Sequence, residues 1–247
     1  MKRLLIIFLS CYCAVNNLFA QNYIAEYNSI ETGRTQLLFN ANEWHYDVTT
    51  TLEITIESSD IDVGDLNEKT PTPSKSISLF NYRSLDKNEY LDEELSFLFV
   101  NPSKSYVIRG KLEKPEWNIL SDSVKMIEGY TCLMAKGFVR GRDYTVWFTP
   151  DIPVSAGPWK IWGLPGLIVD VQSDDGEVEI TMTSLKQTNI FPQKPKVAKT
   201  VSPEEFKVLF QNEMKKFSRR MQSLSEGSSE VTVSNITIMH PDKSLFE

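Results

Sequence analysis

The sequence predicts a mainly β protein: a curved antiparallel sheet, half-barrel or bowl-like in shape, with one C-terminal amphipathic helix packed on it. Short runs of alternating apolar and polar residues recur from Asn22 to about Ile56, and again more densely from Tyr130 to Leu185. Residues 203–225 instead have the spacing of a long amphipathic helix. Successive short strands of this kind are typical of an antiparallel meander.

The first twenty residues have the features of a secretory signal peptide. Two basic residues begin the segment, residues 4–15 are almost entirely apolar, and Leu18-Phe19-Ala20 offers a cleavage site. The apolar core is shorter than the about 20 residues that a membrane anchor needs. We expect residues 1–20 to be removed and residues 21–247 to form a single β-rich domain, exported to the periplasm, the outer membrane or the medium. A buried N-terminal strand and lipidation at Cys11 are the alternatives.

Composition excludes some classes of partner. Removal of residues 1–20 would leave 247 − 20 = 227 residues, enough for one large domain or two small ones. The removed segment carries two basic and no acidic residues, so 24 basic and 33 acidic residues would remain, a net charge of −9. Such a charge argues against nonspecific binding to nucleic acid or to an anionic membrane. After signal cleavage we expect no transmembrane segment.

Cysteine and histidine are scarce. Cys11 and Cys13 would leave with the signal peptide, so Cys132 would remain alone, without a partner for an internal disulfide. The two histidines, His45 and His240, lie at opposite ends of the chain, which does not fit a structural zinc cluster. We expect no metal and no cofactor. Cys132 lies in a strand pattern and is interpreted as a packed core residue, with a redox or nucleophilic role as the alternative.

The first half of the chain after the signal contains several strand candidates. An acidic and then Pro- and Ser-rich stretch, residues 57–76, predicts a loop. The strands expected after it are 76–83, 96–100, 105–112 and a stretch from 117 leading to 125–129.

The middle of the chain predicts a hairpin. Residues 130–139 and 143–149 are two apolar, β-branched and aromatic runs around the turn Arg140-Gly141-Arg142. Strands at 168–171 and 177–185 follow, separated by a turn.

The predicted helix has a clear start. Ser202 is a capping residue, Pro203 occupies the first helical position, and Glu205 stands three residues after the cap. We interpret the helix 203–225 as a cover for one face of the sheet; a membrane-surface or partner-binding helix is the alternative. Residues 229–239 form one more strand candidate, and a natural place for an open sheet edge.

The motif Gly163-Leu164-Pro165-Gly166-Leu167-Ile168 predicts a tight turn that leads into a buried strand. In such a turn Pro165 would set the first corner and Gly166 would supply a positive φ at the second. A phosphate-binding loop is excluded, because a strand instead of a helix follows the glycines. A nucleophile elbow is excluded because its serine is missing.

The chain resembles the GLPGLI family, because all six residues of this hexapeptide match the family signature. Flanking motifs are similar to that family too, among them Ile127–Cys132, Gly141–Phe148 and Gly157–Lys160, and the strongest similarity covers 117–185. The resemblance implies an exported protein of Bacteroidota-type bacteria, from a family largely of unknown function. It also implies similarity to a bowl-like N-terminal module of some secreted glycan-processing enzymes. No catalytic residues come with it.

Four side chains are candidates for a ligand or partner surface. Trp159 and Trp162 lie in the turn-rich stretch and could form an aromatic platform, although core packing is the favoured interpretation for each. Arg140 and Arg142 could clamp an anion, although the favoured interpretation is that one of them pairs with Asp143 or Asp151 and fixes the loop.

The hypothesis that fits these observations is a non-enzymatic envelope protein that binds a protein, a glycan or an apolar ligand in the concavity of its sheet. One alternative is a secreted hydrolase that depends on carboxylates or on Cys132. The other is a structural partner of an outer-membrane transporter, which predicts an open edge strand or an apolar patch.

Overall fold

The structure is a computed structural model, and it describes residues 21–30, 32–52, 55–56, 75–95, 105–225 and 233–234. Its elements, in chain order, are β1 (Asn22–Ser29), β2 (Gly33–Phe39), β3 (Glu43–Leu52), β4 (Thr55–Ile56), β5 (Lys75–Ser84), β6 (Glu89–Leu95), β7 (Ser105–Lys111), β8 (Asn118–Ile127), β9 (Tyr130–Val139), β10 (Arg142–Thr149), β11 (Leu167–Ser173), β12 (Glu179–Thr188), α2 (Pro203–Ser225) and β13 (Val233–Ser234). The predicted signal peptide, residues 57–74 of the predicted loop and the strand candidate 96–100 lie outside the described residues.

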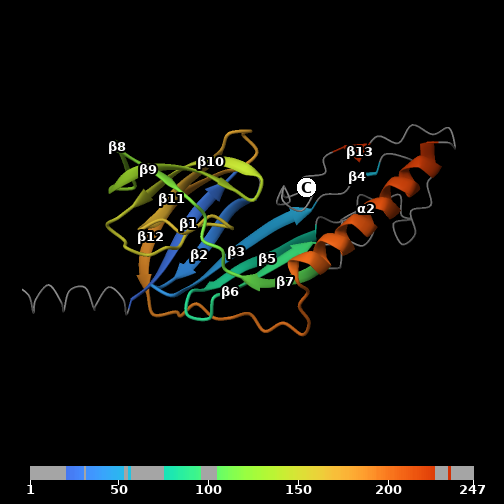
Figure 1. The fold of residues 1–247 in the computed structure, drawn as a ribbon, viewed down its shortest axis with the longest axis horizontal. Helices are drawn as coiled ribbons and strands as arrows, with labels where there is room; N and C mark the ends of the chain where they lie inside the picture. The colour runs from blue at the N-terminus through green and yellow to red at the C-terminus, as the bar shows by residue number, and fades with distance from the viewer. Residues whose placement is uncertain are drawn as a thin grey trace, which may run out of the picture.

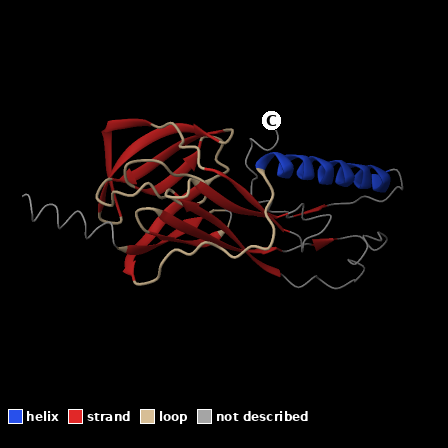
Figure 2. Ribbon diagram, turned by 60° about the horizontal axis from the view of Figure 1, so that its bottom comes forward, coloured by secondary structure: helices blue, strands red, loops and turns tan. Residues whose placement is uncertain are grey.

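Eleven of the described strands form one antiparallel sheet, in the order β7-β6-β5-β3-β2-β1-β12-β11-β10-β9-β8. Strand β1 joins the two halves, because it pairs with β2 on one side and with β12 on the other. The sheet curves strongly but is not closed, since its edge strands β7 and β8 do not pair with each other (Figures 1 and 2). The predicted fold class is confirmed.

The core lies against one face of this sheet, which we call the inner face. Alternate residues of β3 point to it, and Trp44, Tyr46 and Val48 are all buried. The connection between β10 and β11 folds back over the inner face, where Trp162 packs on Trp44 with ring centroids 5.7 Å apart. Each large side chain buried in this way contributes about 1.5–3 kcal/mol. This connection, which contains the GLPGLI sequence, is therefore part of the core.

Helix α2 begins as predicted, with a reciprocal cap. The backbone N–H of Glu205 donates to Ser202 Oγ over 3.1 Å, and the backbone N–H of Ser202 donates to Glu205 Oε2 over 2.8 Å. Phe206 and Phe210 are buried and pack against Tyr90 and Ile108 of β6 and β7. The first turns of α2 thus cover the β6–β7 end of the inner face, and Figure 1 shows the rest of the helix extending beyond the sheet.

Three sequence predictions need correction or completion. The hairpin turn consists of Arg140 and Gly141 alone, with φ of 48° and 81°, and Arg142 belongs to β10. A two-residue turn with positive φ at both positions matches the twist of the flanking strands, which explains the shorter loop. Strand β6 was not predicted. Of the candidate 229–239, the described residues are Val233–Ser234, which pair with β4 in a small second sheet.

The predicted role of Gly166 was wrong. Its φ is not positive; the positive φ in the motif is at Gly163, with 100°. Gly166 is required for a different reason, because a Cβ there would lie 2.3 Å from the carbonyl oxygen of Thr149. The motif is therefore a close crossing of two backbones, followed by Leu167 and Ile168, which are fully buried as predicted.

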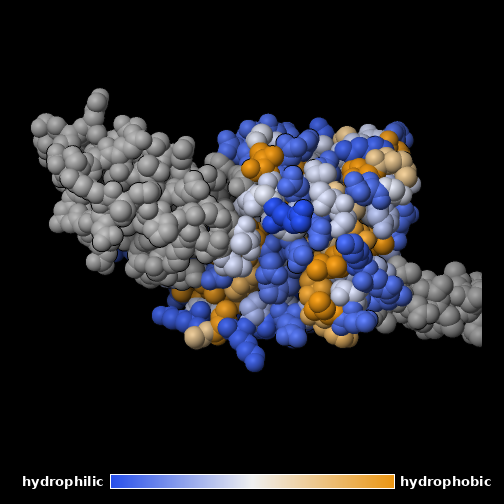
Figure 3. All heavy atoms as spheres, turned by 180° about the vertical axis from the view of Figure 1, so that it is seen from behind, coloured by the Kyte–Doolittle hydropathy of each residue, from blue (hydrophilic) through white to orange (hydrophobic). Residues whose placement is uncertain are grey.

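On the face drawn in Figure 3, most of the described side chains are hydrophilic. Figure 3 shows apolar side chains on the back of the molecule in several separate patches. Val124, Met126 and Phe138 are large apolar residues that are more than half exposed, and they lie on β8 and β9 at one edge of the sheet. In the part of the chain that the structure describes, no helix is both long and apolar enough to cross a membrane.

Candidate functional site

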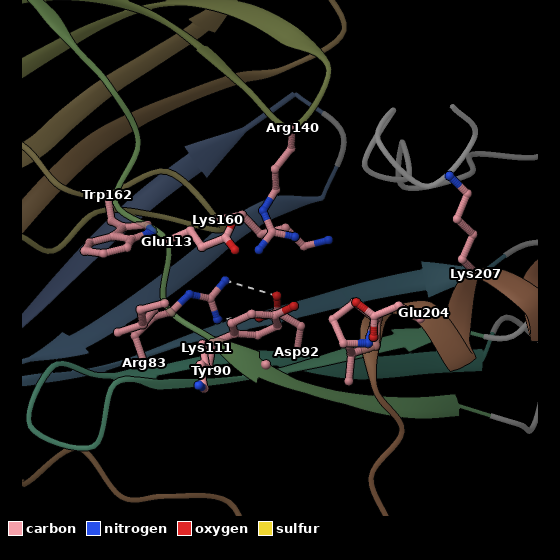
Figure 4. A pocket seen from close by; sticks show the side chains of 14 residues that line it. Arg83, Tyr90, Asp92, Lys111, Glu113, Arg140, Lys160, Trp162, Glu204 and Lys207 are labelled. Carbon is pink, nitrogen blue, oxygen red and sulfur yellow. Dashed lines mark hydrogen bonds and ion pairs between the residues drawn. The ribbon is translucent and has the colours of Figure 1, made fainter.

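A cavity of about 380 Å³ opens on the inner face, beside the start of α2. Its walls come from β5, β6, β7, the β9–β10 hairpin tip, the connection before β11, and the first turn of α2 (Figure 4). Five basic side chains line it, from Arg83, Lys111, Arg140, Lys160 and Lys207. Three acidic side chains line it as well, from Asp92, Glu113 and Glu204. The cavity is therefore a charged pocket and not an apolar one.

A buried ion pair forms its floor. The guanidinium of Arg83 donates to both carboxylate oxygens of Asp92, with 3.1 Å between Nη2 and Oδ2, and each side chain is 1% exposed. Asn81 also donates to Asp92 over 2.9 Å. Burial favours a higher pKa of Asp92, but the nearby charges of Arg83, Lys160 and Arg140 outweigh it and hold the pKa below its usual value. Asp92 is thus a fixed negative charge.

Tyr90 forms the aromatic part of the floor. The guanidinium carbons of Arg83 and Arg140 lie 5.1 Å and 5.4 Å from the centre of its ring. A Cβ on Gly110 would lie 2.5 Å from the same ring, so the glycine leaves the space that the ring occupies. Burial raises the pKa of Tyr90, against an opposing effect of Arg140. Its hydroxyl therefore stays protonated and can donate a hydrogen bond.

Lys160 completes the pocket from the connection before β11. Its side chain is 3% exposed and binds Glu94 of β6. This ion pair links the connection between β10 and β11 to strand β6. Its ammonium group also lies 5.3 Å from the centre of the Trp159 ring. Trp159 has φ of 53°, a conformation that costs a residue with a bulky side chain energy. The site thus keeps a strained residue next to a buried cation.

The four side chains expected at a surface divide into two groups. Arg140 and Trp162 both line the pocket, although Trp162 is also a core residue that is 7% exposed. Trp159 is half-buried beside the pocket and packs against the core. Arg142 is buried elsewhere and donates from Nε to Asp175 over 2.9 Å, so its partner is neither of the two aspartates considered from the sequence. The structure therefore brings Arg140 and Trp162 together and leaves Arg142 outside.

Arg83, Asp92 and Lys160 were not predicted as site residues from the sequence. A charged residue inside an apolar strand pattern was the available signal, since Arg83 follows Tyr82 and Asp92 follows Leu91. The pairing of Arg83 with Tyr90 across β5 and β6 places Asp92 within reach of Arg83. That strand register is seen only in the three-dimensional structure.

Cys132 lies apart from the pocket. Its side chain is fully buried, and burial raises the pKa of its thiol to about 11. The thiol donates weakly to the carbonyl of Tyr130 over 3.4 Å. A thiol in this state packs as a small apolar group and is a poor nucleophile at neutral pH. Among the residues that the structure describes, no three His, Cys, Asp or Glu side chains gather as a metal site would require.

A family model described as a protein of unknown function (Porph_ging) matches residues 138–170. This stretch contains Arg140, Lys160 and Trp162. It thus supplies one wall of the pocket. No curated protein matches the chain.

Among solved structures, the chain is similar to PNGF-II in a C2 crystal form, with a TM-score of 0.52, 18% identity, and coverage of 78% of this chain and 33% of that chain. The P21 form of PNGF-II gives a TM-score of 0.48 and 17% identity, over 74% of this chain and 31% of that chain. An uncharacterized conserved protein from Thermus thermophilus gives 0.38 and 9%, over 78% of this chain and 99% of that chain. The chain spans about a third of PNGF-II, and at this identity the likeness shows the fold alone.

Proposed function

We propose that the chain is an exported cell-envelope protein that acts as a non-enzymatic binding module, with its ligand site in the charged pocket. The observation that carries this proposal is the arrangement of Arg83, Asp92, Arg140 and Lys160, held by several separate elements around an open cavity. Two of the three cations are buried and held by carboxylates. Groups fixed in this way are preorganised for a ligand and lose little conformational entropy when it binds.

The chemistry of the walls favours a polar ligand, such as a glycan, over an apolar one. An apolar ligand would take water away from charged groups and return no hydrogen bonds, which costs free energy for every group left unpaired. A glycan offers hydroxyl groups to the charged side chains and a ring face to Trp162 and Tyr90. The cavity volume of about 380 Å³ lies at the small end of the range of ligand pockets, about 300–1,000 Å³.

The exported character of the protein is part of the same proposal. The basic and apolar start of the chain and its cleavage motif support a signal peptide. The unchanged GLPGLI hexapeptide supports membership of the family of that name, among Bacteroidota. We propose the periplasm, the outer membrane or the medium as its location.

A thermal-shift screen tests the proposal. Neutral saccharides, acidic saccharides, peptides and fatty acids are added to the purified protein and to the variants Arg140→Ala and Arg34→Ala. Arg34 is exposed on β2, away from the pocket, so its variant controls for the lost charge. We expect a polar class to raise the melting temperature of the wild type and of the Arg34 variant, but not of the Arg140 variant. Stabilisation by fatty acids alone, or by no class, would contradict the proposal.

A structural partner of an outer-membrane transporter is the second candidate, favoured by the edge of the sheet at β8. This strand ends the sheet order and carries exposed Val124 and Met126, beside exposed Phe138 of β9. Its test is cross-linking in the cell envelope from a cysteine placed at Met126, with Ile30→Cys as an exposed control elsewhere. A specific adduct with a membrane protein from the first position alone would support it.

The hydrolase alternative has less support. Cys132 is buried with a raised pKa, and Asp92 has a lowered pKa, which suits neither a nucleophilic thiol nor a general acid. Saturable turnover of a simple ester or glycoside by the purified protein would revive it.

A further inference from the structure

The walls of the pocket carry a surplus of positive charge. The lining holds five basic and three acidic side chains. Glu94, which binds Lys160 from outside the lining, reduces the surplus from two charges to one. The whole chain has the opposite sign, with a net charge of −7. The positive charge of the pocket is therefore a local feature, which the overall composition of the chain does not explain.

The cations also lie close to one another. Arg83 and Arg140 both contact the ring of Tyr90, and together with Lys160 they lower the pKa of Asp92. Like charges so close together repel one another. Asp92 is 1% exposed and already accepts hydrogen bonds from Arg83 and Asn81, so its negative charge offsets the repulsion between the cations only at the floor of the pocket. A second anion entering from the open side would lie between Arg140, which Figure 4 shows directed into the cavity, and Lys160, which lines the cavity and also binds Glu94. Coulomb attraction is stronger there than in water, because the site is partly desolvated.

Positive φ occurs at Arg140 and at the residue before Lys160. Arg140 occupies the first position of a two-residue turn with φ of 48°, where Asn or Gly is favoured. Trp159, with φ of 53°, immediately precedes Lys160. Strain of this kind persists where the surrounding structure requires the residue, and it is often found at ligand sites. An arginine at this turn position is consistent with a role for its charge.

The neighbouring surface is aromatic. Trp162 and Tyr90 both line the cavity, with the Tyr90 ring in contact with Arg83 and Arg140, and a volume of about 380 Å³ leaves room for a small ligand only. The acidic side chains Glu113 and Glu204 line the same cavity, so a ligand with several anionic groups would meet repulsion. The arrangement suits one anionic group attached to a ring.

We propose that the pocket binds a small organic anion, a single carboxylate or phosphate carried on a sugar-sized ring, with the anionic group between Arg140 and Lys160 and the ring against Trp162 and Tyr90. This assignment rests on the proposed function, since it names the ligand class of the same site. It goes further in requiring a negative charge on the ligand.

Isothermal titration with a matched pair of sugars tests it. Glucuronate and glucose differ in a carboxylate at one carbon, and inorganic phosphate is titrated as a third probe. We expect glucuronate to bind in the millimolar range or tighter and glucose to bind at least about tenfold more weakly, the effect of one charge-assisted hydrogen bond. Binding of phosphate in competition with glucuronate, and more tightly, would assign the anionic group as a phosphate.

The decisive variant is Arg140→Asn. Asn is a preferred residue at this turn position, so the variant relieves backbone strain while it removes the charge. We expect its melting temperature to be no lower than that of the wild type, and its affinity for glucuronate to fall about ten- to a hundredfold. The control Arg34→Gln removes an equal charge from an exposed position and should bind glucuronate as the wild type does.

The outcomes separate the two proposals. Equal binding of glucose and glucuronate, or unchanged glucuronate binding by Arg140→Asn, overturns the anion assignment. Failure of all three probes, while a neutral ligand from the thermal-shift screen binds, overturns it too and leaves the binding module in place. Failure of every ligand class in both experiments overturns the proposed function itself.

Discussion

Replacing Asp92 with Asn should destabilise the fold more than any change of a surface charge. The carboxylate oxygens of Asp92 accept two hydrogen bonds from Arg83, and both side chains are 1% exposed. An Asn would keep the volume but remove the charge. It would also place either an uncharged oxygen or an N–H donor 3.1 Å from Arg83 Nη2. The buried guanidinium would then lack a counter-charge, with Arg140 and Lys160 nearby.

The expected cost follows from these contacts. Removal of one partner of a buried ion pair costs about 3–5 kcal/mol. A domain has a total stability of about 5–15 kcal/mol, so Asp92→Asn would remove a large share of it. The pair of Glu213 and Lys216 in α2, three residues apart, is the comparison, because its Lys216 side chain is 63% exposed; Glu213→Gln should cost less than about 0.5 kcal/mol.

Urea unfolding followed by tryptophan fluorescence measures both variants. We also expect the double variant Arg83→Met with Asp92→Leu to recover much of the loss, because a buried pair replaced by apolar residues of similar volume is often neutral. If the urea midpoint of Asp92→Asn equalled that of Glu213→Gln, the predicted cost of an unpaired Arg83 would be wrong. The Arg83 charge would then not be buried.

Three further outcomes are expected. Gly166→Ala should lower stability by about 1–3 kcal/mol in thermal melts, because its Cβ would lie 2.3 Å from the Thr149 carbonyl oxygen; an unchanged melting temperature would contradict the close crossing. Cys132, fully buried with a pKa of about 11, should react with iodoacetamide at pH about 8 far more slowly in the native than in the denatured protein, and equal rates would contradict its burial. Burial lowers the pKa of His45, but Asp47 and a backbone carbonyl raise it above its usual value, so the folded state favours the protonated ring. The stability that this ring contributes is present below pH about 6.5 and lost as the pH rises through the folded pKa; His45→Gln should flatten melting temperature against pH, and an unaltered profile would disprove the contribution.

Local features of the fold were predictable from the sequence. The β9–β10 hairpin and the cap at Ser202 depend on residues a few positions apart; the cap occurs as predicted, and the hairpin occurs with a turn one residue shorter than predicted. Strand β6 was missed because its sequence EYLDEEL is rich in acidic residues that strands disfavour. Asp92 and Glu94 are tolerated there because Arg83 and Lys160 neutralise them, and Lys160 lies 66 residues from Glu94. No local pattern carries that information.

The pocket could not be predicted from the sequence either, because its residues are distant from one another along the chain. Arg140 was a candidate because two neighbouring arginines can clamp an anion, and Trp162 because it lies in a turn-rich stretch; the structure places both at one cavity. Arg142 was an equal candidate by sequence, and only the register of β10 directs it to Asp175. The role of Gly166 was misjudged because a Pro-Gly pair predicts a turn from its own residues, whereas its neighbour Thr149 decides the packing.

Native mass spectrometry of the protein purified from the cells that produce it is the direct test of the proposed anion site. We expect a single small ligand, polar and anionic, bound one to one to the wild type and absent from the Arg140→Asn variant prepared in the same way. Capture of a membrane protein with an empty pocket, or equal ligand occupancy in both proteins, would contradict it.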